Sequence, residues 1–282
     1  MRSFLLFLLV LSFFPVSAWA GEKQHVDSTI DDVKVVMAED KVFLGEEMAP
    51  SQAKALALNN ARRRALEKGV GVNLHSNTLL YDGAVVSDLI NSTTRGLIIS
   101  EKVESGCDKE SDRLYCYASI EAHVKPLKGQ ATSKIKFKKA AVQRPDKASV
   151  VDSPVFQHND EIQVRMTLSE DAYINIFSVD QQGNVVRLLP NDHVESKQLH
   201  AWKGFVFPDD SLRTRGIKLR VETPKNRDKA VETVVVIATT EKGHFLQDTS
   251  IENPTITDLM KELSELDQSQ WAQKTIWYEV RR

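Results

Sequence analysis

The chain has 282 residues, and its 37 lysines and arginines nearly balance its 39 aspartates and glutamates, which gives a formal net charge of −2. A nucleic-acid-binding protein would show a strong basic excess, so the composition argues against that class. About 262 residues (282 less a predicted leader of 20) remain in the mature chain. That length is too great for one comfortable core and suits two domains.

Residues 1–20 have the features of a secretory signal peptide. Arg2 gives a positive start, an apolar run extends from Phe4 to Phe14, and Ala18-Trp19-Ala20 fits the small-x-small cleavage pattern. The run is too short to span a bilayer, for which about 20 residues are needed. We therefore expect cleavage after Ala20 and a periplasmic or secreted mature chain. An uncleaved anchor is the alternative.

Residues 21–127 are expected to form an α+β domain, with two helices on one face of an antiparallel sheet. Residues 30–37 and 42–44 predict a pair of strands around a turn at Ala38-Glu39-Asp40. A helix then begins with Ser51 as N-cap and ends at Gly69.

Small side chains recur every fourth residue along this helix, at Ala53, Ala57, Ala61 and Ala65. Such a ridge lets a helix lie close against a sheet. The helix also carries the run 62–64, which is Arg-Arg-Arg. This run could bind an anion or a lipid headgroup, but consecutive helical residues point about 100° apart, so a solvated outer face is favoured.

A second helix is expected at 85–93, followed by a strand at 96–103 and a hairpin closed by two cysteines. Cys107 and Cys116 flank a polar tip in a chain predicted to be exported, so a structural disulfide across the hairpin is expected. The returning strand ends at Pro126 and alternates strictly. Its apolar face holds residues 114, 116, 118, 120, 122 and 124.

The opposite face of that strand carries Tyr115, Tyr117 and His123. Tyrosine offers contact area and a hydrogen bond at low entropic cost, so this face could bind a partner. A neighbouring strand or linker could equally cover it.

The order of these elements resembles the N-terminal domain of the flagellar assembly protein T family over about residues 30–125. The resemblance is carried by ARRRALEKG in the helix, GLIIS at 96–100 and YCYASIEAHV at 115–124. It implies an envelope protein engaged in assembly, and the family has no catalytic residues to carry over.

Residues 128–149 form a basic segment that separates the two expected domains. It includes Lys134, Lys136, Lys138 and Lys139, which could contact an anionic envelope polymer electrostatically. The alternative is a solvated linker with an edge strand at 135–142, whose lysines protect the edge.

Residues 150–282 are expected to form a β-sandwich with one short C-terminal helix. At its centre is a hairpin in which a strand at 172–179, partly buried on both faces, turns at Gly183 into 185–189. The continuous apolar run 234–238 suits a central strand. Thr255 is expected to cap the helix, and residues 276–280 to form the last strand.

This half resembles the bacterial family known as domain of unknown function 4384 over about residues 150–282. The resemblance is carried by DAYINIFSVDQQGNVVRLLPN at 171–191, the Phe207-Pro208 strand end, VVVIAT at 234–239 and WYEV at 277–280. It implies a β-sandwich, often appended to other envelope modules, and says almost nothing about activity.

No catalytic constellation, cofactor motif or metal-ligand spacing stands out in the chain. The histidines are scattered, at positions 25, 75, 123, 158, 193, 200 and 244. Asp192, His193 and His200 form a weak candidate metal site in one polar loop, although such histidines are more often simply exposed.

Three tryptophans of the second half, Trp202, Trp271 and Trp277, could line a glycan groove. In a sandwich they more often fill the core or plug an edge.

These patterns predict an exported, non-enzymatic envelope protein that serves as a binding or assembly module for a cell-envelope or surface-appendage machine, with envelope proteins as partners. A periplasmic ligand- or glycan-binding protein is the alternative. A hydrolase whose triad comes together only in space is the weakest interpretation.

Overall fold

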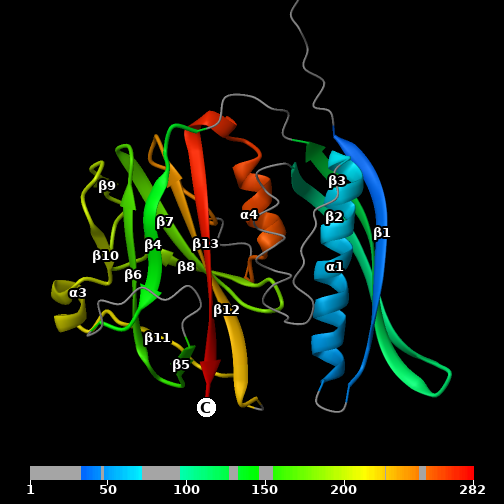
Figure 1. Ribbon diagram of the computed structural model, residues 1–282. Coiled ribbons are helices and arrows are strands. Elements are labelled where there is room, and N and C mark those ends of the chain that lie inside the picture. Colours follow the sequence, from blue (N-terminus) through cyan, green and yellow to red (C-terminus); the bar gives the residue numbers. More distant parts are fainter. Residues whose placement is uncertain are drawn as a thin grey trace, which may run out of the picture. The chain divides into compact units, whose positions relative to one another are not determined.

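The computed structural model describes residues 33–45, 48–71, 96–126, 133–145, 155–225, 227–247 and 252–282 (Figure 1). The signal peptide predicted at 1–20 and the helix expected at 85–93 lie outside these ranges. Most of the described elements are strands, accompanied by a few helices, which confirms a sheet-rich fold.

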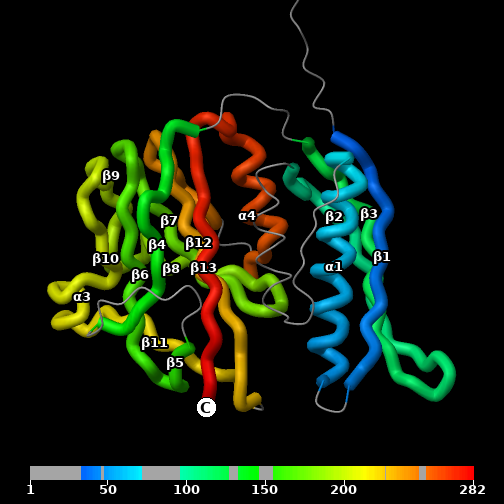
Figure 2. Tube along the Cα trace, in the orientation of Figure 1, coloured from blue at the N-terminus to red at the C-terminus, as the bar shows by residue number. Residues whose placement is uncertain are grey.

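The N-terminal part is a three-stranded antiparallel sheet covered on one face by a helix (Figures 1 and 2). Its strands are β1 (Lys34–Phe43), β2 (Gly96–Glu110) and β3 (Arg113–Pro126), in the order β1-β3-β2. The covering helix is α1 (Pro50–Val70).

Strand β1 is continuous, so the turn predicted at Ala38-Glu39-Asp40 is wrong. These three residues pair with residues 118–120 of β3 in unbroken register. Ala38 is buried against α1, and the Asp40 carboxylate accepts a hydrogen bond of 2.7 Å from Asn60 Nδ2. Contacts with α1 therefore keep Ala38-Glu39-Asp40 in a strand, although this sequence is typical of a turn.

The alanine ridge of α1 is confirmed, because Ala53, Ala57, Ala61 and Ala65 are fully buried. The predicted helix ends are wrong by one or two residues. Ala49 is the N-cap, and its backbone N–H donates to Gln52 Oε1 at 2.7 Å.

The helix continues past Gly69 to Gly71, which adopts a left-handed φ of 77°. Gly69 serves a different purpose, since a Cβ there would lie 2.5 Å from Val124 Cγ1. Its missing side chain lets α1 approach β3 closely.

The β2–β3 hairpin turns at Ser111 and Asp112, which have φ values of 47° and 64°. Cys107 lies directly opposite Cys116 in the ladder, and the two form the expected disulfide. The alternation predicted for β3 is confirmed from residue 116 onward, where every second side chain is buried as far as Val124. Leu114, at the exposed end of the hairpin, is 36% exposed.

The C-terminal part contains two further sheets. The first consists of β4 (Phe137–Gln143), β6 (Glu161–Leu168), β10 (Phe205–Phe207) and β11 (Leu219–Arg220). The second consists of β5 (Val155–Gln157), β7 (Ala172–Val179), β8 (Val185–Leu189), β9 (Gln198–Leu199), β12 (Lys229–Thr239) and β13 (Trp271–Arg281). Short helices are α3 (Asp210–Thr214), α4 (Ile256–Leu263) and the 3-10 turn η1 (Gln268–Gln270).

The central hairpin β7–β8 has the predicted form, with Gly183 at a φ of 85° in its turn. The last strand begins at Trp271 and so is longer than expected. The basic segment supplies β4, which pairs along β6, so residues 137–143 form an edge strand and not a free linker. The proposed division of the chain into two domains stays a prediction.

Strand β7 and the apolar run of β12, in the middle of the six-stranded sheet, are buried on both faces, as predicted for β7 and as suits a central strand. Even-numbered residues of β7, β12 and β13 face the sandwich core, which they share with the first sheet. This core includes Val164, Met166, Leu168, Ile174, Ile176, Phe207, Val234, Val236, Tyr278 and Val280. Successive side chains of a strand point to opposite faces of the sheet, so one strand can contribute side chains to two cores.

Odd-numbered residues of the same strands face a second cluster, the shared core, which also contains side chains of α1, β2, β3 and α4. It includes Leu66, Leu97, Ile98, Phe177, Val235, Ile237, Phe245, Leu259, Met260 and Trp271. The predicted cap of α4 is confirmed, because Thr255 N–H and Oγ1 both donate to Asp258 Oδ2, at 2.7 and 2.8 Å.

One arginine of the 62–64 run is buried, which corrects the prediction of a solvated face. The Arg62 guanidinium donates to the Glu101 carboxylate, with Nη2 2.5 Å from Oε1 and Nε 3.1 Å from both oxygens. The two side chains are only 5% and 10% exposed. Thr257 Oγ1 at the start of α4 also donates to Glu101, at 3.3 Å.

The other two arginines of the run, Arg63 and Arg64, pair with Glu67 and Asp40 at 2.8 and 2.6 Å. All three cations of the run are therefore used within the fold, and α1 offers no free anion patch at these positions.

Between β12 and β13, Tyr278 donates its hydroxyl to Glu232 Oε2 at 2.7 Å. Burial raises the pKa of Glu232 above its ordinary value, and the tyrosine hydrogen bond opposes the rise only in part. Because the folded pKa exceeds the unfolded one, the folded state binds more protons in the window between them. Glu232 therefore makes the free energy of unfolding fall as pH rises through that window.

Candidate functional site

The face of the three-stranded sheet that points away from α1 is here called the outer face. It is defined by Val35, Met37, Lys41, Phe43, Tyr115, Tyr117 and His123, which lie at alternate positions of paired strands β1 and β3. Val35 and Met37 are 61% and 59% exposed, so no described residue covers them. A large apolar pair left exposed on a sheet is a common mark of an interaction surface.

An aromatic cluster with two cations occupies one end of the outer face. The Phe43 and Tyr115 ring centroids are 5.7 Å apart, and those of Tyr115 and Tyr117 are 6.4 Å apart. Lys41 Nζ lies 5.3 Å from both the Phe43 and Tyr115 centroids, and Arg113 lies 4.6 Å from that of Phe43. Cations over aromatic faces are attracted to the ring quadrupole, which orders these long side chains.

The three residues predicted for this face do share it, but they do not form one cluster. His123 is six residues from Tyr117 along β3, a separation of about 20 Å at strand spacing, and it pairs with Val35. The sequence reasoning missed Val35, Met37, Lys41 and Phe43. A single unbroken strand at 34–43 would have placed Lys41 and Phe43 beside the tyrosines, and Val35 and Met37 further along the same face beside His123.

The three tryptophans do not line a common groove. Trp271 is buried in the shared core, whereas Trp202 and Trp277 are 65% and 42% exposed. Trp271 and Trp277 are six residues apart on β13, again about 20 Å. Trp202 lies beside the basic segment, with Lys138 Nζ 4.9 Å from its ring centroid.

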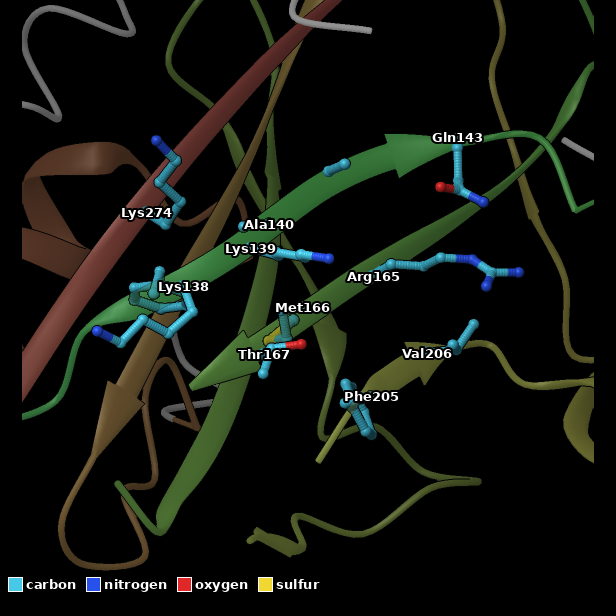
Figure 3. Close-up of a pocket in the computed structure, with 13 residues that line it drawn as sticks. Lys138, Lys139, Ala140, Gln143, Arg165, Met166, Thr167, Phe205, Val206 and Lys274 are labelled. Carbon is cyan, nitrogen blue, oxygen red and sulfur yellow. The ribbon is translucent and has the colours of Figure 1, made fainter. Parts of the chain in front are cut away.

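The four described lysines of the basic segment are exposed, and two of them line a cavity of about 600 Å³ (Figure 3). This feature is here called the basic cavity. Its cationic lining consists of Lys138, Lys139, Arg165 and Lys274, and Lys134 and Lys136 lie outside it. Of these only Lys138 and Lys139 were predicted. Arg165 and Lys274 come from β6 and β13, far away in the sequence.

Arg165 is held at the cavity by a short chain of hydrogen bonds. Its Nη2 donates to Gln163 Oε1 at 3.1 Å, and Gln163 Nε2 donates to the Pro208 carbonyl at 2.8 Å. Gln163 is buried, so it provides a fixed support. Arg165 Nε is also buried and has no hydrogen-bond partner.

The loop histidines are not brought together as metal ligands. His200 Nδ1 lies 3.1 Å from Asp171 Oδ2, while His193 lines another cavity. The Ala201 N–H and the His200 ring hydrogen-bond to Asp171 and lower the pKa of its carboxyl. Within the described ranges, no group of three or more His, Cys, Asp or Glu side chains could hold a metal ion.

Residues 155–242 match the family model described as Domain of unknown function (DUF4384). The match extends from β5 to just beyond β12 and supports the resemblance noted for the C-terminal half. No curated protein matches the chain. The likeness of residues 30–125 to the flagellar assembly protein T family has no such support and stays a hypothesis.

The DUF4384 segment supplies only part of the basic cavity. Arg165, Phe205 and Val206 lie within the segment, whereas Lys138 and Lys139 precede it and Lys274 follows it. The cavity therefore depends on strands that flank the family match. Among the described residues, no helix is long and apolar enough to cross a membrane.

Proposed function

We propose that this protein is exported and acts as a non-enzymatic binding or assembly module of a cell-envelope or surface-appendage machine. Its partner is an envelope protein that docks on the outer face. The observation that carries the proposal is the pair of exposed apolar side chains, Val35 and Met37, in line with the aromatic cluster around Tyr115.

The chemistry of the outer face suits a protein partner. Tyrosine, methionine and arginine are enriched at protein interfaces, and aromatic anchors contribute most of the energy of many complexes. Here Tyr115 lies against Phe43, and Lys41 contacts both rings while it also pairs with Glu110 at 2.6 Å. Such pre-ordered side chains lose little entropy when a partner binds.

Export is the second part of the proposal. The apolar run after Arg2 and the Ala18-Trp19-Ala20 site support it. So does the disulfide between Cys107 and Cys116, because disulfides persist in oxidising compartments.

We also propose the finer domain arrangement, an α+β domain at 21–127 followed by a β-sandwich domain at 150–282. The three-stranded sheet with α1 and the two sheets around the sandwich core support it. In this arrangement the shared core forms where the two domains meet.

The test uses tagged protein purified from envelope fractions after crosslinking, read by mass spectrometry. Val35→Glu places a charge in the outer face, and Val186→Glu is the matched control, since Val186 on β8 is 60% exposed. We expect one stoichiometric partner with the wild type and the control, and its loss with Val35→Glu. A partner retained equally by all three proteins contradicts docking on the outer face, and recovery of the protein alone contradicts the assembly role.

A periplasmic ligand-binding role is the second candidate function. The basic cavity favours it, because a cavity of about 600 Å³ falls within the usual size range of small-molecule sites.

A further inference from the structure

We propose that the basic cavity binds a phosphorylated ligand that carries an apolar group. This inference does not depend on the protein partner proposed above, because the cavity lies on β4, β6, β10 and β13 and the outer face lies on β1 and β3. It deepens the ligand-binding alternative by naming the chemical class of the ligand.

Four positive charges and no negative charge line the basic cavity. The cations are Lys138, Lys139, Arg165 and Lys274, and no aspartate or glutamate is among the lining residues. None of the four forms a salt bridge with a described carboxylate. Other cations of the fold, such as Arg64 and Arg213, have acidic partners. Uncompensated cations around a concavity attract anions and raise their local concentration.

The register of the sheet places two of these cations on one face. Lys139 pairs with Thr167, and Arg165 pairs with Ala141, so Lys139 and Arg165 are diagonal neighbours on β4 and β6. The Cβ atoms of such neighbours are about 7–8 Å apart, which allows both side chains to reach one anion. Figure 3 shows the two side chains extending in the same direction from adjacent strands.

The state of Arg165 indicates an anionic ligand more specifically. Gln163 occupies one nitrogen of the guanidinium and fixes its orientation, while the buried Nε lacks a hydrogen-bond acceptor. The guanidinium is therefore not saturated within the fold, and its N–H groups that Gln163 does not engage can donate to a bound oxyanion. Guanidinium groups bind phosphate in a bidentate fashion, and a phosphate monoester carries about two negative charges with three acceptor oxygens.

The remaining walls are apolar, which indicates that the ligand is more than a free phosphate ion. Val206 pairs with Arg165 and shares its face, and the partly buried Phe137, Ala140 and Phe205 also belong to the lining, whereas the Met166 side chain is buried in the sandwich core. Apolar area buried against such walls adds about 25 cal/mol per Å² to binding. A phosphate ester with an alkyl or acyl group would satisfy both kinds of surface.

A second cavity of about 580 Å³ also contains cations, of which Arg187 and Lys218 are already used within the fold and Arg215 is not paired with a described carboxylate. Arg187 donates to the carbonyls of Phe245 and Leu246, and Lys218 pairs with Glu161 at 3.3 Å. The comparison favours the basic cavity as the anion site.

Isothermal titration of the full mature chain with n-hexyl phosphate and with inorganic phosphate tests the proposal. Arg165→Gln removes the central cation, and Lys139→Gln with Lys274→Gln removes two exposed ones with little risk to folding. The double variant Lys134→Gln with Lys136→Gln is the matched control, because it removes the same charge from exposed positions outside the cavity.

We expect the wild type and the control to bind hexyl phosphate equally and more tightly than inorganic phosphate. Arg165→Gln and the Lys139/Lys274 double variant should each raise Kd by about tenfold or more, since a charge-assisted hydrogen bond contributes about 1.5–3 kcal/mol. Absence of binding by the wild type overturns the proposal, and so does an equal loss in the two double variants.

Vesicles of phosphatidylcholine with and without phosphatidylglycerol separate two sources of the phosphate. If the wild type and the control sediment with the anionic vesicles and Arg165→Gln does not, the site binds a lipid headgroup. Binding of hexyl phosphate without vesicle binding assigns it to a soluble phosphate ester. Either result supports binding of a phosphate group in the basic cavity. The proposal is contradicted if only the Lys134/Lys136 variant loses vesicle binding.

Discussion

Replacing Arg62 by methionine should destabilise the protein strongly, although the sequence favoured a solvated face for the arginine run to which it belongs. The substitution keeps the apolar stem of the side chain and removes the guanidinium from a carboxylate that is only 10% exposed. Among the described residues, only the Thr257 hydroxyl would then still donate a hydrogen bond to the Glu101 carboxylate.

The expected cost follows from the burial of the pair. Removing one partner of a buried ion pair costs about 3–5 kcal/mol, because the remaining charge stays buried without compensation. Replacing both partners, Arg62→Met with Glu101→Leu, should restore most of that loss, since an apolar pair needs no compensation. With Glu101→Leu as the second single variant, which should cost a similar amount, the coupling free energy between the two positions should be at least about 3 kcal/mol.

Urea unfolding followed by circular dichroism measures this cycle. At a slope of about 2 kcal/mol per M, a loss of 4 kcal/mol lowers the midpoint by about 2 M. Lys102→Met is the control, because Lys102 and Glu121 form an exposed pair at 3.2 Å, and its loss should cost about 1 kcal/mol at most. A midpoint for Arg62→Met equal to that of the control, or a double variant no more stable than the single one, would refute the reasoning.

Three further substitutions test the packing around the two cores. Asn175→Leu should stabilise the protein by about 1–3 kcal/mol in urea, because both amide atoms are buried without hydrogen-bond partners. Glu232→Gln keeps an acceptor for Tyr278 and should flatten the fall in stability above about pH 4, measured by thermal unfolding across pH. Gly69→Ala should cost about 1–2 kcal/mol, as overpacking against Val124 exceeds the gain in helix propensity.

Each of these has a result that would count against it. A lower midpoint for Asn175→Leu would mean that the amide has partners in solution. If Glu232→Gln leaves the pH dependence of thermal stability unchanged, a group other than Glu232 causes the fall in stability. For Gly69→Ala, the added substitution Val124→Ala should recover part of the loss, and no recovery would show that close packing of α1 on β3 is not the cause.

Local signals predicted much of the fold. The strict alternation of β3, the Gly183 turn and the Thr255 cap each depend on neighbours within a few residues, and all three are found. The apolar run in β12 also indicated burial on both faces correctly.

The incorrect predictions concern residues whose conformation or burial depends on partners that are far away in the sequence. Asp40 lies within a strand because Asn60 and Arg64 of α1 bind its carboxylate, and Arg62 is buried because Glu101 comes from β2. Sequence periodicity contains no record of such partners, so polar residues were assigned to a turn or to solvent.

The candidate site was predictable only in part, for the same reason. The lysines at 138 and 139 are visible as a basic run, but their place with Arg165 and Lys274 in the lining of one cavity requires the pairing of β4 with β6 and the approach of β13. The outer face was half predicted, since Tyr115 and Tyr117 alternate within one strand while Val35 and Met37 belong to its partner.

Site-specific photo-crosslinking in intact cells tests the central claim most directly. A photoreactive amino acid replaces Val35 on the outer face. The matched control places it at Val186 on β8, because the two valines are nearly equally exposed. We predict one discrete adduct with an envelope protein from position 35 and none from position 186. The same adducts from both positions, or no adduct from position 35, would contradict a partner docked on the outer face.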